Sequence, residues 1–388
     1  MVFPHAPTEA EPTSAEWARE LAGRLVRPTT ADRDRERGWD SDLFAELIDA
    51  GPGLAGPMVP TSLGGGGLSA TRTCAVLEGL GEGGRDPGLA LAVGVHAVLA
   101  TVPIATYGSA RQQEHYLSRM ASGEWLGAVS LRQTQGSALA PTVWVRPAGS
   151  GLDGWVLTGE LDLVALAPVA HHFLVIAAHE DGRRTAFVVD RTAPGVTIDD
   201  SVGPAAMPTC PWGRVVLDAC PVPDQAVLGT VGGAAAEVEP LLASLDWVFS
   251  SAPWVGVLRA LTRDAVDAVQ EHRIFGRPVA HVQSARFTLA DMATRCELAA
   301  GLLYRAALRF DTDDPHSHED AAAVRLFVAN AARTVVEGAA RLSGPFALTG
   351  DDLVERAHRD ALFFAGTGGG TEVLRPVIAA SLLGLGRA

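Results

Sequence analysis

Hydrophobic positions recur at helical spacing in the first and last thirds of the chain and alternate in short runs between them. In Asp42–Asp49, for example, Leu43, Leu47 and Ile48 share one helix face. The middle third consists of β-type runs such as HFLVIAAH and TAFVVD, with Gly, Pro and Asp between them. The pattern predicts an α+β, multi-domain chain with a helical domain at 1–126, an all-β domain at 127–233 and a helical bundle at 234–388.

Composition narrows the classes of function. The 388 residues are 47% hydrophobic and 20% charged, and the net charge of −14 argues against binding nucleic acid or an anionic membrane. The four cysteines are far apart, which excludes a disulfide framework and a zinc site of the CxxC type. We find no signal-peptide pattern and no uninterrupted apolar run long enough to span a membrane, so we expect a cytoplasmic protein.

The bundle is predicted to begin with a helix over Pro240–Ile274. Trp247 and Trp254 lie seven residues apart and would share one face of that helix, next to Asp246. They fit an apolar cavity and ordinary core packing equally well. The remaining helices are expected at Ala280–Phe310, Asp320–Ser343, Asp351–Phe364 and Thr371–Leu383.

Three long segments carry a resemblance to a known family. They are His96–Leu131, with its Tyr-Gly-Ser turn and Ala-Ser-Gly-Glu-Trp lead into the β domain, then Phe275–Arg295, and Leu353–Ala361. In this order they resemble the acyl-CoA dehydrogenases. The resemblance implies an N-terminal helical domain, a central β-barrel and a C-terminal four-helix bundle, assembled as a homodimer or homotetramer. It also implies FAD between barrel and bundle, a carboxylate that removes the proton alpha to a thioester carbonyl, and hydride transfer from the beta carbon.

The carboxylate of the family is not at its usual place. Counting from Arg359 puts that position at Gly368, and the nearby Glu372 is an ordinary acidic residue for the first turn of a helix. A minority of the family supplies the base from an earlier bundle helix, where one register matches Asp246. A second register makes Asp246 a structural aspartate. The two registers differ by two residues, about 200° around a helix, and both remain open.

The flavin contacts depart from the family at the ring. A strand Trp and a Thr or Ser are replaced by Leu163 and Ala165, and a ring-bonding Thr by Arg132. Gly136 and Ser137 remain as cofactor contacts.

The dinucleotide tail keeps more of its contacts. Phe275 and Gln283 are retained, and Arg273 stands beside the position of a family arginine. Of the glycines in the adenine loop only Gly344 is left. Because these losses occur together, we expect FAD binding to be weak or absent.

Two further features concern histidines. His96 lies in a buried-looking helix that faces the substrate in relatives, and it is either a general acid or a core histidine with its hydrogen bonds satisfied. His171 and His172 are predicted to lie in a surface turn.

Three functions remain open. The first is non-redox cyclisation or isomerisation of an acyl or polyketide-like chain, free or on CoA or a carrier protein, in natural product biosynthesis. Asp246, His96 or Arg132 would catalyse it. The second is an FAD-dependent acyl-thioester dehydrogenase with Asp246 as base, and the third is a non-catalytic partner subunit of a flavin enzyme. The candidate substrate cavity is lined by Trp247, Trp254, Leu163 and Gly368.

Overall fold

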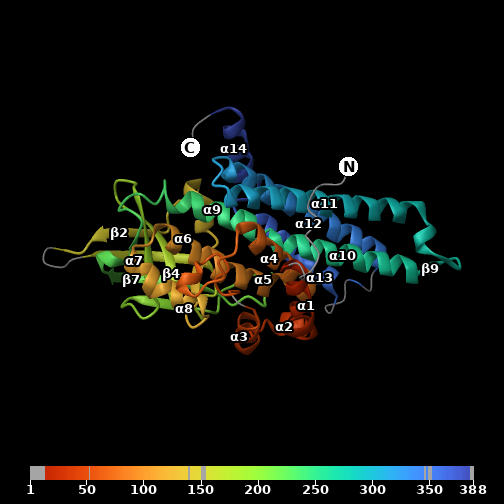
Figure 1. Cartoon of the computed structure of the whole chain (residues 1–388), viewed down its shortest axis with the longest axis horizontal. Helices are drawn as coiled ribbons and strands as arrows, with labels where there is room; N and C mark the ends of the chain where they lie inside the picture. The colour runs from red at the N-terminus through yellow and green to blue at the C-terminus, as the bar shows by residue number, and fades with distance from the viewer. Residues whose placement is uncertain are drawn as a thin grey trace.

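The computed structural model describes residues 14–51, 53–138, 140–149, 154–344, 347 and 352–384, without the side chains of 136–138. The molecule is elongated, with the strands gathered at one end and the long helices of the bundle extending to the other (Figure 1). The predicted fold class is confirmed: helical N- and C-terminal parts flank a central sheet.

The N-terminal helices are more broken than their apolar pattern suggests. The predicted helix over Leu89–Tyr107 is continuous from Pro87, but its middle third is π-helical. Asp86 caps it by accepting a hydrogen bond from the Leu89 amide, and Pro87 takes the first position, where no amide hydrogen is needed. The elements are α1 (Ser14–Leu25), α2 (Thr30–Glu36), α3 (Ser41–Asp49), α4 (Ala70–Gly84), α5 (Pro87–Gly94), η3 (Val95–Ala100), α6 (Thr101–Tyr107), α7 (Ala110–Gln112), η4 (Gln113–Leu117) and α8 (Ser118–Ala121).

The central domain is a mixed eight-stranded sheet in the order β6-β7-β3-β1-β4-β5-β8. Strand β1 runs parallel to β4, and β2 pairs with both β3 and β4, so the sheet closes on itself at this point. The strands are β1 (Gly127–Ser130), β2 (Val143–Pro147), β3 (Trp155–Ala165), β4 (His172–Ala178), β5 (Arg184–Asp190), β6 (Val196–Asp199), β7 (Trp212–Val222) and β8 (Val227–Leu228), with the 3-10 segment η5 (Gln133–Ala138) after β1.

The first predicted bundle helix is wrong in one respect, because it is two helices. They are α9 (Val238–Phe249) and α10 (Ala252–Glu271). Pro253 has no amide hydrogen to donate to a carbonyl one turn earlier, so a new helix starts around it. After the hairpin of β9 (Arg273–Ile274) and β10 (Arg277–Pro278) come α11 (Gln283–Asp311), α12 (Ser317–Ser343), α13 (Leu353–Gly366) and α14 (Gly370–Leu382).

Two helical stretches, Pro87–Tyr107 and Val238–Glu271, are long and apolar enough to cross a membrane by length and composition alone. In the fold they are 94% and 89% buried against other elements. Core packing therefore accounts for their apolar character.

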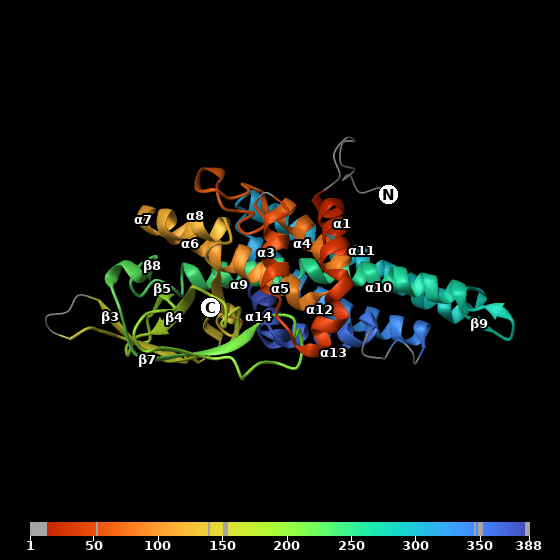
Figure 2. The same ribbon diagram turned by 90° about the horizontal axis from the view of Figure 1, so that it is seen from below.

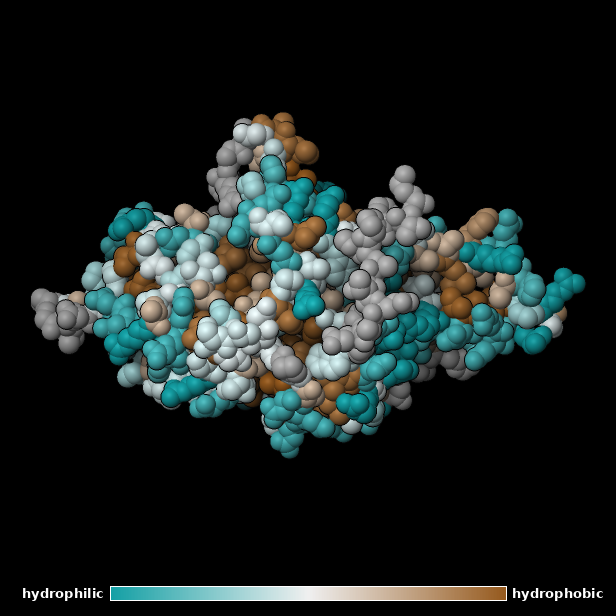
Figure 3. Space-filling view, viewed as in Figure 1, coloured by the Kyte–Doolittle hydropathy of each residue, from teal (hydrophilic) through white to brown (hydrophobic). Residues whose placement is uncertain are grey.

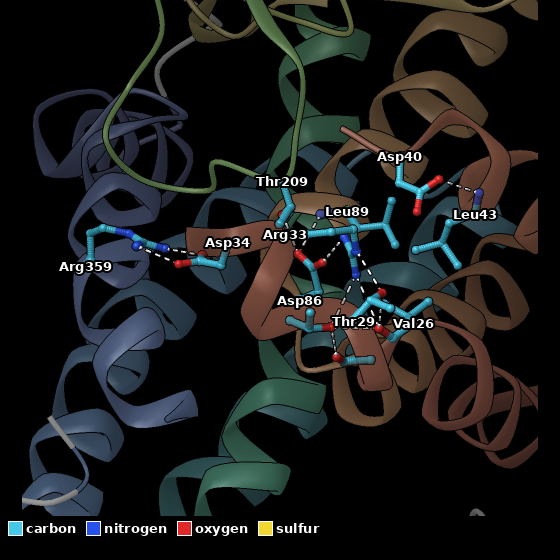
Figure 4. A network of polar contacts seen from close by, with 12 residues as sticks. Val26, Thr29, Arg33, Asp34, Asp40, Leu43, Asp86, Leu89, Thr209 and Arg359 are labelled. Atoms are coloured by element: carbon cyan, nitrogen blue, oxygen red, sulfur yellow. Dashed lines mark hydrogen bonds and ion pairs between the residues drawn. The ribbon is translucent and has the colours of Figure 1, made fainter. Parts of the chain in front are cut away.

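A buried polar network ties the N-terminal helices to the sheet and the bundle (Figure 4). The Arg33 guanidinium pairs with the Asp86 carboxylate at 2.8 Å, and Asp86 also accepts a hydrogen bond from the Thr209 hydroxyl. On the other side, Arg359 of α13 donates two hydrogen bonds to Asp34 of α2. These links connect α2, α5, the loop before β7 and α13, the elements that surround the cavity described next.

Candidate functional site

A small enclosed cavity lies where the three parts of the chain meet. Helices α9 and α12 pack against each other there, next to the sheet (Figure 2). The cavity holds about 10 Å³, the size of one water molecule. Its walls are mostly apolar, with one carboxylate and one guanidinium among them. It is lined by Pro87, Leu91, Leu131, Met207, Asp246, Ser250, Pro253, Trp254, Arg325, Phe363, Phe364 and Thr367.

Asp246 faces this cavity from α9 and is 1% exposed. Its carboxylate accepts a hydrogen bond from the Thr134 hydroxyl at 2.8 Å and from the Ser250 hydroxyl at 2.6 Å. Ser250 follows one helical turn later, and Thr134 reaches across from η5. The structure thus gives Asp246 the orientation of the first sequence register, while the two hydroxyls also anchor it as a structural group would. Its catalytic role stays a prediction.

Arg325, on α12, is the charged group that the sequence analysis missed. It is 1% exposed, and its Nη2 donates hydrogen bonds to the Phe364 carbonyl and the Thr367 hydroxyl. Its Nε and Nη1 have no hydrogen-bond partner among the described residues. Burial lowers the pKa of Arg325 to about 10, and the Asp246 carboxylate opposes that change.

Gly368, the position of the usual base by sequence, lies against this guanidinium. Its φ of +67° is in the left-handed region, and a Cβ added there would be 3.0 Å from the Arg325 Nε. The guanidinium therefore occupies the space into which a side chain at residue 368 would project. Glu372 is exposed in the first turn of α14 and does not line the cavity.

The two tryptophans have different positions because they lie on different helices. Trp254 lines the cavity and stacks on Phe364, with ring centroids 5.1 Å apart. Trp247 does not line it, contrary to our prediction. Its indole N–H donates to the Gly368 carbonyl, and its ring packs on His318. Trp247 thus holds the loop that carries Gly368.

The structure does not bring Leu163 or Arg132 to this cavity. Leu163 has a φ of +49° and accepts a hydrogen bond from the Leu131 amide through its carbonyl. Arg132 lines a second small cavity with Glu239 and Thr142, and its buried Nε has no partner among the described residues. Arg132 and Asp246 therefore belong to separate sites.

His96 is a core histidine and not a general acid at the cavity. It is fully buried, its Nε2 is 3.1 Å from the Met120 carbonyl, and its Nδ1 accepts from the Gly127 amide. Both ring nitrogens are occupied, and burial lowers its pKa to about 4. The surface turn predicted for His172 is also wrong, since this residue begins β4 and is 2% exposed.

The residues predicted for the dinucleotide tail lie far from the cavity of their own chain. Arg273, Phe275 and Gln283 surround the β9 hairpin, which forms the tip of the bundle in Figures 1 and 2. The Phe275 side chain is fully exposed. Gly344 ends α12 with a φ of +76°, and Gly136 and Ser137 fall where side chains are not described. A cofactor that used both groups of residues would have to bind between two copies of the chain.

The donor set at the sheet fits a flavin only through a few contacts. Arg132 offers a buried N–H without a partner, which suits the carbonyl-bearing edge of the ring or its reduced, anionic form. Leu163 and Ala165 offer apolar contact without a side-chain hydrogen bond. The cavity beside them has room for one water, so a ring could be seated only if η5 moved away from α9. This arrangement is consistent with a flavin that is held weakly.

Comparison with known families assigns both ends of the chain. The family described as "Acyl-CoA dehydrogenase, N-terminal domain" matches residues 8–124, and "Acyl-CoA dehydrogenase, C-terminal domain" matches residues 249–383. The two matches are in the order that the sequence motifs implied.

Comparison with individual proteins agrees over the whole length. The chain is 30% identical to benzylmalonyl-CoA dehydrogenase of Aromatoleum aromaticum, over 91% of this chain and 93% of that one. It is 27% identical to L-prolyl-[peptidyl-carrier protein] dehydrogenase of Pseudomonas fluorescens, over 68% of this chain and 70% of that one. The solved structure of butyryl-CoA dehydrogenase from Megasphaera elsdenii superposes with a TM-score of 0.89 at 24% identity, over 98% and 100% of the chains, which shows the shared fold.

Proposed function

This chain belongs to the acyl-CoA dehydrogenase family, and we propose that it is an acyl-thioester oxidoreductase whose base is Asp246. The substrate would be an acyl group on CoA or on a carrier protein, since relatives of both kinds are similar to this chain. Asp246 would remove the proton alpha to the thioester carbonyl.

One observation carries the proposal: a buried carboxylate and a buried guanidinium line the same cavity at the junction of sheet and bundle. Two hydroxyl donors, Thr134 and Ser250, orient the Asp246 carboxylate and leave its other lone pairs free to accept a proton. Trp254 and Phe364 form an aromatic wall that excludes water from the reacting carbon. A bound substrate has to displace η5 from α9, because the present cavity holds no more than one water.

FAD, when bound, would supply the acceptor for the hydride of the beta carbon. Arg132 is the residue of this chain that would hold it at the sheet. Arg273, Phe275 and Gln283 at the bundle tip would hold the tail of the cofactor in a neighbouring copy, so the proposed assembly is a homo-oligomer. A cytoplasmic location is part of the same proposal.

A second candidate is proton transfer without oxidation, as in isomerisation of an acyl or polyketide-like chain. The replacement of the ring contacts by Leu163 and Ala165 favours it, because a chain that holds no flavin can still abstract and return a proton. None of the relatives named above has that activity in its name. The two candidates share the Asp246 step and differ in their need for FAD.

The experiment follows the α-hydrogens of butyryl-CoA in D2O by mass spectrometry, with and without added FAD and an electron-acceptor dye. Exchange of α-hydrogens for deuterium supports the Asp246 step. Loss of two hydrogens only when FAD and dye are present supports the oxidoreductase, whereas exchange without any oxidation supports the second candidate. Absence of both exchange and oxidation with CoA and carrier-protein thioesters would contradict the proposal and favour a non-catalytic subunit.

A further inference from the structure

Arg325 has no part in the proton transfer proposed above, yet it is the most unusual group in the cavity. Its guanidinium is buried, and its contacts are the Phe364 carbonyl, the Thr367 hydroxyl and the face of the Phe364 ring, 3.7 Å away. All of these are neutral. The N–H groups on Nε and Nη1 have no partner among the described residues. A cation buried in this way lacks the anion that would offset its loss of hydration.

Asp246 does not supply that anion. Both of its oxygens accept hydrogen bonds from hydroxyls, and neither is bonded to Arg325. Since Arg325 and Asp246 line one cavity, a molecule placed there would touch both. The vacant N–H groups of Arg325 then mark the place of a negatively charged part of that molecule.

We propose that Arg325 binds a free carboxylate of the substrate, so that the substrate is an acyl thioester of a dicarboxylic acid. This inference rests on the proposed function, because it takes the same cavity as the acyl site. The carboxylate is on the reacting carbon or next to it, since the guanidinium stands where the base of the family would approach that carbon, beside Gly368.

A carboxylate satisfies the site better than a thioester carbonyl does. It brings a full negative charge to a buried cation and has two oxygens for the Nε and Nη1 hydrogens, so the contact is a charge-assisted hydrogen bond. A neutral carbonyl would accept one hydrogen bond and leave the charge uncompensated. The guanidinium also offsets the added negative charge that forms when Asp246 removes a proton near a carboxylate.

Binding of two thioesters with the same number of acyl carbons tests the inference without FAD or turnover. Succinyl-CoA and butyryl-CoA differ in the terminal carboxylate, and calorimetric titration measures the Kd of each. We expect the wild type to bind succinyl-CoA at least about tenfold more tightly. Arg325→Met should weaken succinyl-CoA binding at least about tenfold and leave butyryl-CoA binding nearly unchanged. Arg333→Met, which removes an exposed arginine from the same helix, should keep the wild-type preference.

The amide analogue of succinyl-CoA tests the same contact in the unaltered protein, which covers the case in which Arg325→Met does not fold. Equal Kd values for acid and amide, or a preference for succinyl-CoA that survives in folded Arg325→Met, would overturn the inference. The proposed function has a separate readout, the exchange of α-hydrogens in butyryl-CoA. If that exchange occurs and the preference for a carboxylate is absent, only the assignment of Arg325 fails.

Discussion

The guanidinium of Arg325 and the α-carbon of Gly368 lie so close that a Cβ at residue 368 would be 3.0 Å from Nε and 3.2 Å from Cζ. Loss of the usual base and burial of an arginine are therefore linked in this chain. A glutamate at residue 368 would have to displace the guanidinium before it could face the cavity. The replacement of glutamate by glycine makes room for a cation in the place of an anion.

We expect Gly368→Ala to lower the free energy of unfolding by about 1–3 kcal/mol. Its φ of +67° disfavours an L side chain, and the new methyl group would press on Arg325. The matched control is Gly366→Ala, at the end of α13, where a Cβ meets nothing within 4 Å. That control should be neutral or slightly stabilising, and urea denaturation measures both. Equal stability of the two variants would contradict the contact between residue 368 and Arg325.

Asp246→Asn should reduce α-hydrogen exchange by roughly 10²-fold or more, the scale of a lost general base. The loss of stability should be small, about 1 kcal/mol or less, because the asparagine carbonyl oxygen can still accept one of the two hydroxyl hydrogen bonds. Exchange and thermal melting are measured on one preparation, with Asp267→Asn on the exposed face of α10 as control. If Asp246 is only structural, the outcome is reversed: a lower melting temperature with exchange kept by the folded fraction.

The sequence predicts the arrangement of the chain well, because long periodic segments dominate it. The helical, β and helical thirds are where the pattern places them, and the first bundle helix is wrong only at the break before Pro253. That break changed the site, since it separated Trp247 from Trp254. The side of α9 on which Asp246 lies could not be decided from sequence, because two registers differed by half a turn. Tertiary contacts with Thr134 decide it.

Arg325 was missed because arginine in a long helix is usually solvated. A signal was present in the sequence: the positions three and four residues away on either side are Ala321, Ala322, Val328 and Ala329, and all are buried. An arginine in the middle of an apolar stripe is a candidate for a buried cation. His96 shows the reverse case, in which a residue with suitable chemistry is used for packing, and only its two hydrogen bonds reveal that.

We expect protein purified without added FAD to contain much less than one flavin per chain. Arg132 gives the described ring site one vacant donor, and the strand positions Leu163 and Ala165 give it none. Flavin released by denaturation and measured by fluorescence gives the ratio. Titration with FAD should raise the melting temperature only at high concentration, as mass action requires for a weak ligand. Stoichiometric flavin in the purified protein would show that the remaining contacts suffice.

The chain should form an oligomer through the bundle. Apolar residues are exposed near the β9 end and at the end of α14, as Figure 3 shows, and they include Ile274, Phe275, Phe287 and Leu382. Phe275→Asp combined with Phe287→Asp should shift the mass measured by light scattering toward the monomer. Trp144→Asp, at an exposed tryptophan of β2 in the sheet domain, is the control and should leave the mass unchanged. A wild-type monomer at micromolar concentration would refute the expected assembly.

Stability should fall with acid because two histidines are buried in their neutral form. Burial lowers the pKa of His172 to about 3 and that of His96 to about 4, from an ordinary 6.5. Below that ordinary value the unfolded chain takes up protons that the folded chain does not. The stabilisation is therefore complete above about pH 6.5 and is lost as the pH falls toward 4, at up to about 1.4 kcal/mol per pH unit for each histidine.

His172 provides the sharper test, since neither of its ring nitrogens has a hydrogen-bond partner among the described residues. His172→Phe keeps an aromatic ring beside Tyr116 and Trp125 and removes the proton site. Urea denaturation between pH 7 and pH 4.5 should show a shallower loss of stability for this variant than for the wild type. His281→Phe, at an exposed position, should keep the wild-type slope. Identical slopes for His172→Phe and the wild type would mean that His172 gains a proton in the folded protein as readily as in the unfolded chain.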